Sequence, residues 1–126
     1  MNKIREDNEL PLVTSEWGWK YHHLGIPVKK KMPDETYLKK YKLYVSGFST
    51  CPFGIEWMRF EKDSQINKLI QSVPHLAFEV KNIDLELSIH NFKVISKPES
   101  NFIGIKVAMI EFNGAPIELI EFEKNK

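Results

Sequence analysis

The stretch YHHLGIPV, residues 21–28, decides the fold, because most of it recurs later in the chain. HLGIPV at 23–28 returns as HLAFEV at 75–80, with His, Leu, a small residue, a large apolar residue and Val in the same order. A second pair follows, since IEWMRFE at 55–61 returns as IELIEFE at 117–123. The sequence therefore contains an internal repeat, and we expect two copies of one structural module.

The two-residue period of a β-strand assigns the faces of the two His segments. His23 shares one face with Gly25, and His75 shares one face with Ala77, whereas the large apolar residues point the other way. A small residue beside each imidazole predicts open space in front of it. We expect these two strands to form the floor of a cleft.

The same period predicts where the neighbouring aromatic residues point. Trp17, Trp19 and Tyr21 continue the His23 face outward, so Trp19 and Tyr21 are candidates for substrate binding at the mouth of the cleft. The alternative is packing at a dimer contact or under the N-terminal segment. His22 points to the opposite face in this interpretation.

Each Glu segment carries one carboxylate in the middle of an apolar strand. Glu56 and Glu118 are costly to bury unless each is paired or bound to a cation. Two carboxylates, each matched to a histidine of the same half, predict one shared cation. The alternative is that these polar residues line a pocket that binds an organic ligand without metal.

The remaining pattern predicts an α+β fold. Seven segments rich in β-branched and aromatic residues predict strands: 17–28, 41–48, 54–61, 75–80, 92–97, 103–112 and 116–123. Helices are predicted from Pro33 to about Lys40, over 63–72, and over 85–90 after a cap at Asn82 or Asp84. Asn113-Gly114 predicts a hairpin turn.

These paired motifs resemble the vicinal oxygen chelate superfamily, the glyoxalase and bleomycin-resistance fold, over about residues 17–123. The resemblance implies two βαβββ modules whose mixed sheet curls around a cleft. A single domain over 1–126 then contains module one at about 17–61, a linker helix at about 63–72 and module two at about 75–123. Module one is shortened, with room for only two clear strands after its helix.

The resemblance also implies a metal site. The family takes one ligand from the first strand and one from the last strand of each module, and the matching residues here are His23, Glu56, His75 and Glu118. This set is similar to those of glyoxalase I and methylmalonyl-CoA epimerase. Imidazoles with carboxylates suit zinc, nickel, cobalt, manganese or iron.

The implied activity is that of a metal-dependent isomerase, epimerase or lyase. Its small substrate carries vicinal oxygens and reacts through an enediolate-like intermediate, with Glu118 as the expected base. The alternative is a metal-free binding protein of the same fold for a small molecule. A homodimer is also expected from the resemblance.

Composition limits the other classes of function. The 126 residues carry a net charge of +1, which gives no electrostatic reason to expect a nucleic acid or an anionic membrane as partner. Met1–Asn8 is polar, and no apolar run approaches the ~20 residues of a membrane span. With one cysteine, Cys51, and no expected signal peptide, we predict a cytoplasmic protein. Lys29–Lys31 is either a simple solvated run or a receptor for a phosphate or carboxylate.

Overall fold

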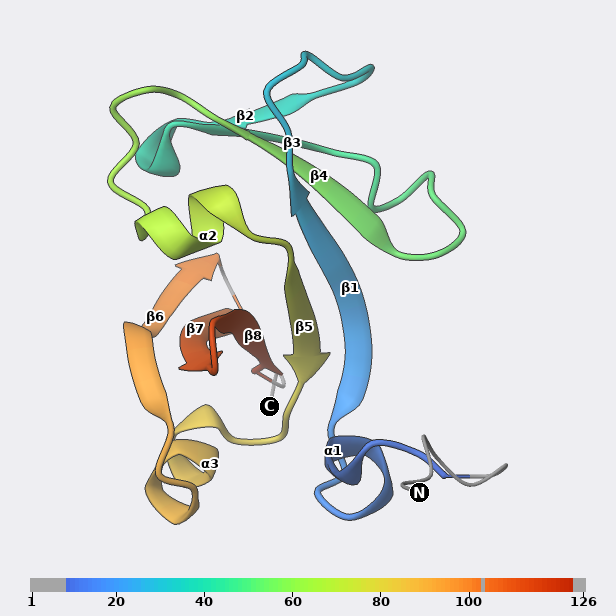
Figure 1. Ribbon diagram of the computed structural model, residues 1–126, viewed down its shortest axis with the longest axis vertical. Coiled ribbons are helices and arrows are strands. Elements are labelled where there is room, and N and C mark those ends of the chain that lie inside the picture. Colours follow the sequence, from blue (N-terminus) through green and yellow to red (C-terminus); the bar gives the residue numbers. More distant parts are fainter. Residues whose placement is uncertain (1–8, 103, 124–126) are drawn as a thin grey trace, which may run out of the picture.

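The computed structural model describes residues 9–102 and 104–123 and contains one eight-stranded sheet (Figure 1). The polar segment expected at residues 1–8 lies outside the described residues. The strand order is β2-β3-β4-β1-β5-β8-β7-β6. The elements are α1 (Leu12–Ser15), β1 (Lys20–Pro27), β2 (Thr36–Leu38), the 3-10 helix η1 (Lys39–Tyr41), β3 (Leu43–Ser46), β4 (Ile55–Phe60), α2 (Lys68–Ser72), β5 (His75–Glu79), α3 (Ile83–Ile89), β6 (Lys93–Phe102), β7 (Ile105–Phe112) and β8 (Ala115–Phe122).

The strand order repeats the duplication seen in the sequence. In each half the first strand pairs in parallel with the last, β1 with β4 and β5 with β8. The two halves meet where β1 pairs antiparallel with β5 at the centre of the sheet. The predicted α+β class and the curled mixed sheet are confirmed.

The first half differs from the prediction, because it loses its helix and keeps its strands. The helix predicted from Pro33 to Lys40 is wrong: this segment contains strand β2 followed by η1. Asp34 has a φ of 56°, a left-handed conformation that interrupts a helix, and Lys42 reverses the chain with a φ of 51°. Thr36–Leu38 then pairs antiparallel with β3. Three strands therefore follow β1, where two were expected.

The second half contains the predicted helix. α3 begins after Asn82, whose side chain accepts a hydrogen bond from the Leu85 N–H at 2.9 Å. The linker helix is shorter than the predicted 63–72, because α2 begins after the cap at Asn67. The hairpin at Asn113-Gly114 is confirmed, with φ values of 49° and 87°.

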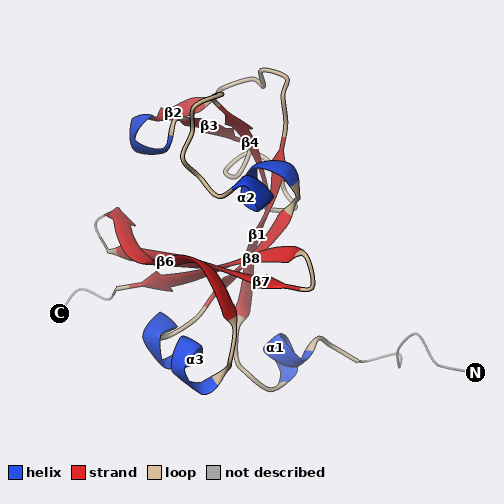
Figure 2. Cartoon of the chain, turned by 60° about the vertical axis from the view of Figure 1, so that its left-hand side comes forward, coloured by secondary structure: helices blue, strands red, loops and turns tan. Residues whose placement is uncertain are grey.

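Two apolar clusters lie on opposite faces of the sheet. The outer cluster packs beneath α3, and the inner cluster packs against α2. Figure 2 shows these two helices on opposite sides of β6–β8. The outer cluster contains Trp19, Val80, Ile83, Ala108 and Leu119. The inner cluster contains Leu43, Met58, Ile70 and Met109.

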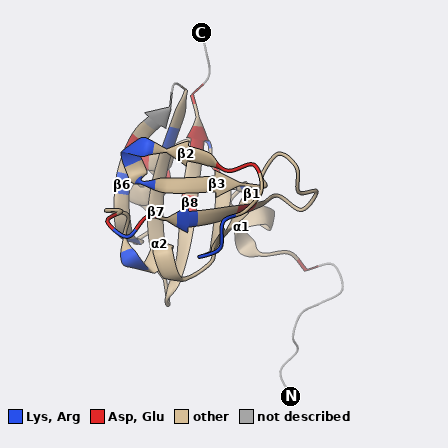
Figure 3. Ribbon diagram, turned by 90° about the horizontal axis from the view of Figure 1, so that it is seen from above, with Lys and Arg blue, Asp and Glu red and all other residues tan. Residues whose placement is uncertain are grey.

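Charged residues of both signs are interspersed along the ribbon (Figure 3). Two lysines near η1 form ion pairs, Lys40 with Glu99 at 2.6 Å and Lys42 with Asp63 at 2.5 Å. The Lys40 pair joins η1 of the first half to β6 of the second. Within the described residues, no helix is long and apolar enough to cross a membrane.

Candidate metal centre

Strand register places the two carboxylates in equivalent positions. In the β1–β4 pair Gly25 lies beside Glu56, and in the β5–β8 pair Ala77 lies beside Glu118. Gly25 and Ala77 are the small residues at the same place in the two repeats. The repeated motif therefore produces the same strand pairing in both halves. This pairing directs both carboxylates to the concave face.

The antiparallel β1–β5 pair brings the two imidazoles together. His23 lies opposite Ala77, and Gly25 lies opposite His75. A Cβ at Gly25 would lie 2.2 Å from Cε1 of His75, so the His75 ring occupies the space that a side chain at Gly25 would need. The sequence predicted open space here. The imidazole of the other half fills it.

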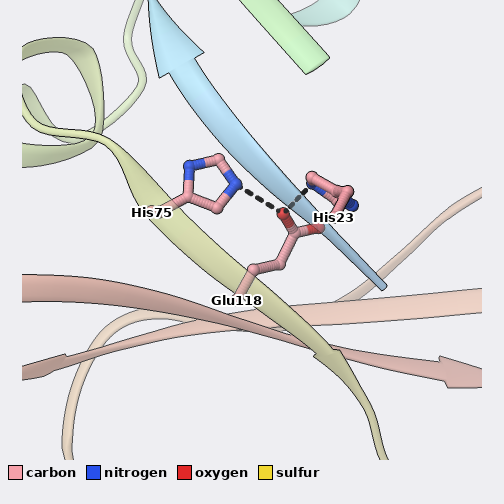
Figure 4. A group of neighbouring side chains, drawn as sticks. All are labelled: His23, His75 and Glu118. Atoms are coloured by element: carbon pink, nitrogen blue, oxygen red, sulfur yellow. Dashed lines mark hydrogen bonds and ion pairs between the residues drawn. The ribbon is translucent and has the colours of Figure 1, made fainter. Parts of the chain in front are cut away.

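Three of the four predicted ligands form one cluster (Figure 4). Glu118 Oε1 lies 3.0 Å from His75 Nε2 and 3.4 Å from His23 Nε2. The ligand atoms of these three residues all lie within 4.8 Å of one another. Both histidines are buried, at 5% exposure for His23 and 2% for His75. A single chain supplies the whole cluster.

Glu56, the fourth predicted ligand, lies at the edge of this cluster. Its Oε1 is 3.5 Å from His23 Nε2, and it lines the same cavity as the other three residues. Among the described residues, the group whose ligand atoms all lie within 4.8 Å of one another contains Glu118 but not Glu56. The two acids therefore differ in position, although they match each other in register.

Electrostatics favours positive charge among these groups. Burial opposes ionisation of Glu118, but the nearby imidazoles of His23 and His75 lower the pKa of its carboxyl to about 2. Burial acts to lower the pKa of His23, but the Glu118 and Glu56 carboxylates raise it above its ordinary value. Burial also raises the pKa of Glu56. A proton or a metal ion would supply the charge that this cluster attracts.

The residues fit a divalent metal ion. His23 Nε2 is buried and forms no hydrogen bond with any described group, although it faces carboxylate oxygens at 3.4 and 3.5 Å. An ion among these atoms would bind the lone pair of His23 Nε2 together with His75 Nε2 and a Glu118 oxygen. Two imidazole nitrogens and a carboxylate are ligands that zinc, nickel, cobalt, manganese and iron accept.

His22 faces the cavity, contrary to the prediction from a strict two-residue period. The β1–β5 register shifts between Tyr21, which lies opposite Phe78, and His23, which lies opposite Ala77, so that His22 is an extra residue in β1. Such a bulge inserts one residue into a strand and redirects the side chains beside it. His22 Nδ1 lies 2.8 Å from His23 Nδ1. The only sequence signal for this was two adjacent histidines.

The bulge also moves the aromatic row away from the cleft. Trp19 is 3% exposed in the outer cluster, and its Nε1–H donates to Glu86 Oε1 at 3.0 Å. In the β1–β5 strand pair Tyr21 lies opposite Phe78, and the Tyr21 hydroxyl donates a hydrogen bond to the Phe53 carbonyl. Neither residue lines the cavity. The predicted orientation of Trp19 and Tyr21 toward the cleft is therefore corrected.

The cluster opens into a largely apolar cavity of about 510 Å³. Its walls come from both halves of the sheet and from the segment that contains α2. Prominent apolar residues of the lining are Leu38, Phe48, Met58, Ile70, Met109 and Phe122. The histidines and acids described above form one polar part of the lining, and Ser96, Lys97 and Glu99 of β6 form another. A ligand would therefore meet charge at the cluster and hydrocarbon along most of its length.

Comparison with known proteins shows the fold. No family model matches the sequence, and no curated protein matches it significantly. A hypothetical protein from Bacillus halodurans C-125 superposes with a TM-score of 0.64 and 21% identity, over 86% of this chain and 97% of that chain. Methylmalonyl-CoA epimerase from Mycobacterium tuberculosis superposes with a TM-score of 0.58 and 16% identity, over 83% and 89%. The chain thus has the vicinal oxygen chelate type of fold that its motifs predicted.

Proposed function

We propose that this protein is a divalent-metal-dependent isomerase, epimerase or lyase that acts on a small substrate with vicinal oxygens. The observation that carries the proposal is the convergence of His23, His75 and Glu118 in an otherwise largely apolar cavity. The structural likeness to an epimerase supports the same class of chemistry. The apolar walls favour a substrate whose body is an uncharged aliphatic or aromatic group.

His23, His75 and Glu118 would hold the ion, which when bound supplies a Lewis acid for negative charge on the substrate oxygens. The buried imidazoles present nitrogen lone pairs, and Glu118 supplies an oxygen between them. Residues of the inner cluster surround the substrate and exclude water from the reacting carbon.

A carboxylate beside the cluster would accept the proton. The C–H bond next to the substrate carbonyl breaks, the proton moves to the carboxylate, and the electron pair moves to the carbonyl oxygen to form an enediolate-like intermediate. Sequence resemblance favours Glu118 as this base. Geometry favours Glu56, because Glu118 Oε1 lies between both imidazoles whereas Glu56 Oε1 lies 3.5 Å from His23 Nε2 at the edge of the cluster. We therefore propose Glu56 as the base, Glu118 as a ligand, and the reverse assignment as the alternative.

The first experiment is metal analysis of protein purified without chelator, followed by zinc titration. We expect about one ion per wild-type chain, because the described residues contain one such cluster of ligands. His75→Ala removes a central ligand and should lose the ion. Glu118→Gln should bind it more weakly than Glu56→Gln, since Glu56 lies at the edge of the cluster.

His90→Ala is the matched control for His75→Ala. His90 stacks on Trp17 and pairs with Glu86, outside the metal cluster. This variant should keep its ion. A folded wild-type protein that binds none of zinc, nickel, cobalt, manganese or iron would contradict the proposal, and so would equal metal content in His75→Ala and wild type.

The cavity favours a second candidate, a metal-free binding protein for a small apolar molecule. Its lining is mainly hydrocarbon, which suits sequestration of such a compound without chemistry. A fluorescent apolar dye would then bind equally well before and after metal removal. Under the enzyme proposal, the ion should change the affinity for a ligand that carries vicinal oxygens.

A further inference from the structure

The bulge in β1 creates a contact between adjacent histidines. Their Nδ1 atoms lie 2.8 Å apart, which is hydrogen-bonding distance. Each ring nitrogen of an imidazole either carries a proton or offers a lone pair. One of the two Nδ1 atoms must therefore donate, and the other must accept.

The surroundings of His23 Nε2 decide which of the two Nδ1 atoms donates the hydrogen bond. His23 Nε2 faces Glu118 and Glu56, where the proposed ion would bind. A histidine that binds a cation through Nε2 keeps its lone pair there and carries its proton on Nδ1. The Nδ1–H of His23 then donates to Nδ1 of His22, whose own proton lies on Nε2.

The His22 ring is held in place for this task. It stacks on Phe48 with centroids 4.9 Å apart and an interplanar angle of 11°, and Phe122 lies 5.6 Å away. His22 and both phenylalanines line the cavity. The acceptor nitrogen is thus fixed by packing, and the bulge directs it toward His23.

We infer that His22 is a positioning residue, which accepts the Nδ1–H of His23 and holds His23 in the tautomer that presents Nε2 to a metal ion. This inference rests on the proposed metal-dependent function. Histidine ligands commonly donate their second N–H to a carboxylate, a carbonyl or water. In this protein an adjacent imidazole provides the acceptor.

Two substitutions separate positioning from packing. His22→Phe keeps an aromatic ring against Phe48 but removes the acceptor, whereas His22→Asn places a carbonyl oxygen near the position of Nδ1 and loses the ring. We expect zinc affinity to fall roughly 10- to 100-fold in His22→Phe, the usual cost of removing such a partner. His22→Asn should stay within about threefold of wild type. A packing role predicts the reverse order.

A second readout reports the tautomer directly. Long-range ¹H–¹⁵N NMR spectra of the zinc-loaded protein should show His23 protonated at Nδ1 and His22 protonated at Nε2. The opposite pair of tautomers would overturn the inference, even if His22→Phe failed to fold. Equal zinc affinity in wild type and His22→Phe would overturn it alone. Wild-type protein that binds none of zinc, nickel, cobalt, manganese or iron would instead contradict the proposed function, and the inference with it; where another of these metals binds in place of zinc, the same measurements are made with that metal.

Discussion

The two halves of the sheet carry the same register but different coverings. β1 and β4 hold Gly25 beside Glu56 just as β5 and β8 hold Ala77 beside Glu118. The outer face of the second half is packed under α3, whereas the first half has no α-helix between its first two strands. Since both carboxylates reach the concave face, strand register places them there and the helix only covers the back.

The halves also differ inside the site. Glu118 approaches both imidazoles, whereas Glu56 approaches His23. His75 lies against a glycine, but its counterpart His23 lies opposite an alanine and is accompanied by the bulged His22. Duplication thus supplied two equivalent pairs, and small local changes gave the two acids different surroundings.

The largest expected effect tests the difference in covering. Trp19→Ala removes a 3% exposed side chain from the cluster under α3 and should lower the free energy of unfolding by about 3–5 kcal/mol. Trp57→Ala, on the half-buried outer face of β4, should cost less. Urea unfolding measures both.

The outcome of that pair also bears on the correction of Trp19. Metal binding should survive in Trp19→Ala wherever the protein is folded, because Trp19 does not line the cavity. An equal or larger loss of stability in Trp57→Ala would mean that the outer face of β4 contributes as much to the stability of the fold as the cluster under α3.

The duplication could be predicted from sequence because each motif fixes its own register. His, a small residue two positions later and a mid-strand Glu leave few ways to pair two strands with all these groups on one face. The proximity of His23, His75 and Glu118 was therefore predicted without the structure, and Glu56 lies at the edge of their cluster; their role as ligands stays a prediction. Short β2 was missed because Pro33-Asp34-Glu35 imitates a helix start, while the left-handed Asp34 is not visible in sequence.

The bulge could not be predicted for a different reason. A strict two-residue period has no place for an inserted residue, so one bulge at His22 reverses the expected faces of every residue before it. Trp19 and Tyr21 were misplaced together for this reason, and His22 was assigned to the wrong face. A single local irregularity therefore accounts for all three errors around the site.

The second prediction exchanges the small residues of the two halves. Gly25→Ala places a Cβ where the His75 ring lies, 2.2 Å from its Cε1, and should cost about 1–3 kcal/mol through overpacking. It should also weaken zinc binding, because His75 must move. Ala77→Gly removes one buried methyl group and should cost about 1 kcal/mol.

Zinc titration and urea unfolding of both variants give the comparison. Ala77→Gly should keep its zinc affinity, since His23 gains space and no group is displaced. If Gly25→Ala binds zinc as tightly as wild type, then the close packing of His75 on Gly25 does not position that ligand.

The smallest expected effect concerns the ion pair between Arg59 and Glu35 in the first half of the sheet, which has no helix equivalent to α3. Arg59 on β4 binds Glu35 through two hydrogen bonds, of 2.7 and 2.9 Å, and its guanidinium lies 4.1 Å from the Tyr44 ring centroid. The hydrogen bonds from Arg59 lower the pKa of Glu35 to about 2. Because this pKa lies below the value of about 4.3 in an unfolded chain, ionised Glu35 stabilises the fold above that pH. Its contribution is lost as the pH falls from there toward 2.

Glu35→Gln should therefore lower the free energy of unfolding at pH 7, and the difference from wild type should shrink by pH 3. Asp84→Asn is the matched control in the second half, because Asp84 pairs with Lys106 at 3.2 Å but its side chain is 69% exposed. Water screens such a pair, so this variant should change stability little at either pH.

Urea unfolding at both pH values measures all three proteins, and residues that titrate in common cancel from the differences. If the difference in the free energy of unfolding between Glu35→Gln and wild type stays constant with pH, the charge of Glu35 does not contribute to stability. The effect would then come from packing of the side chain.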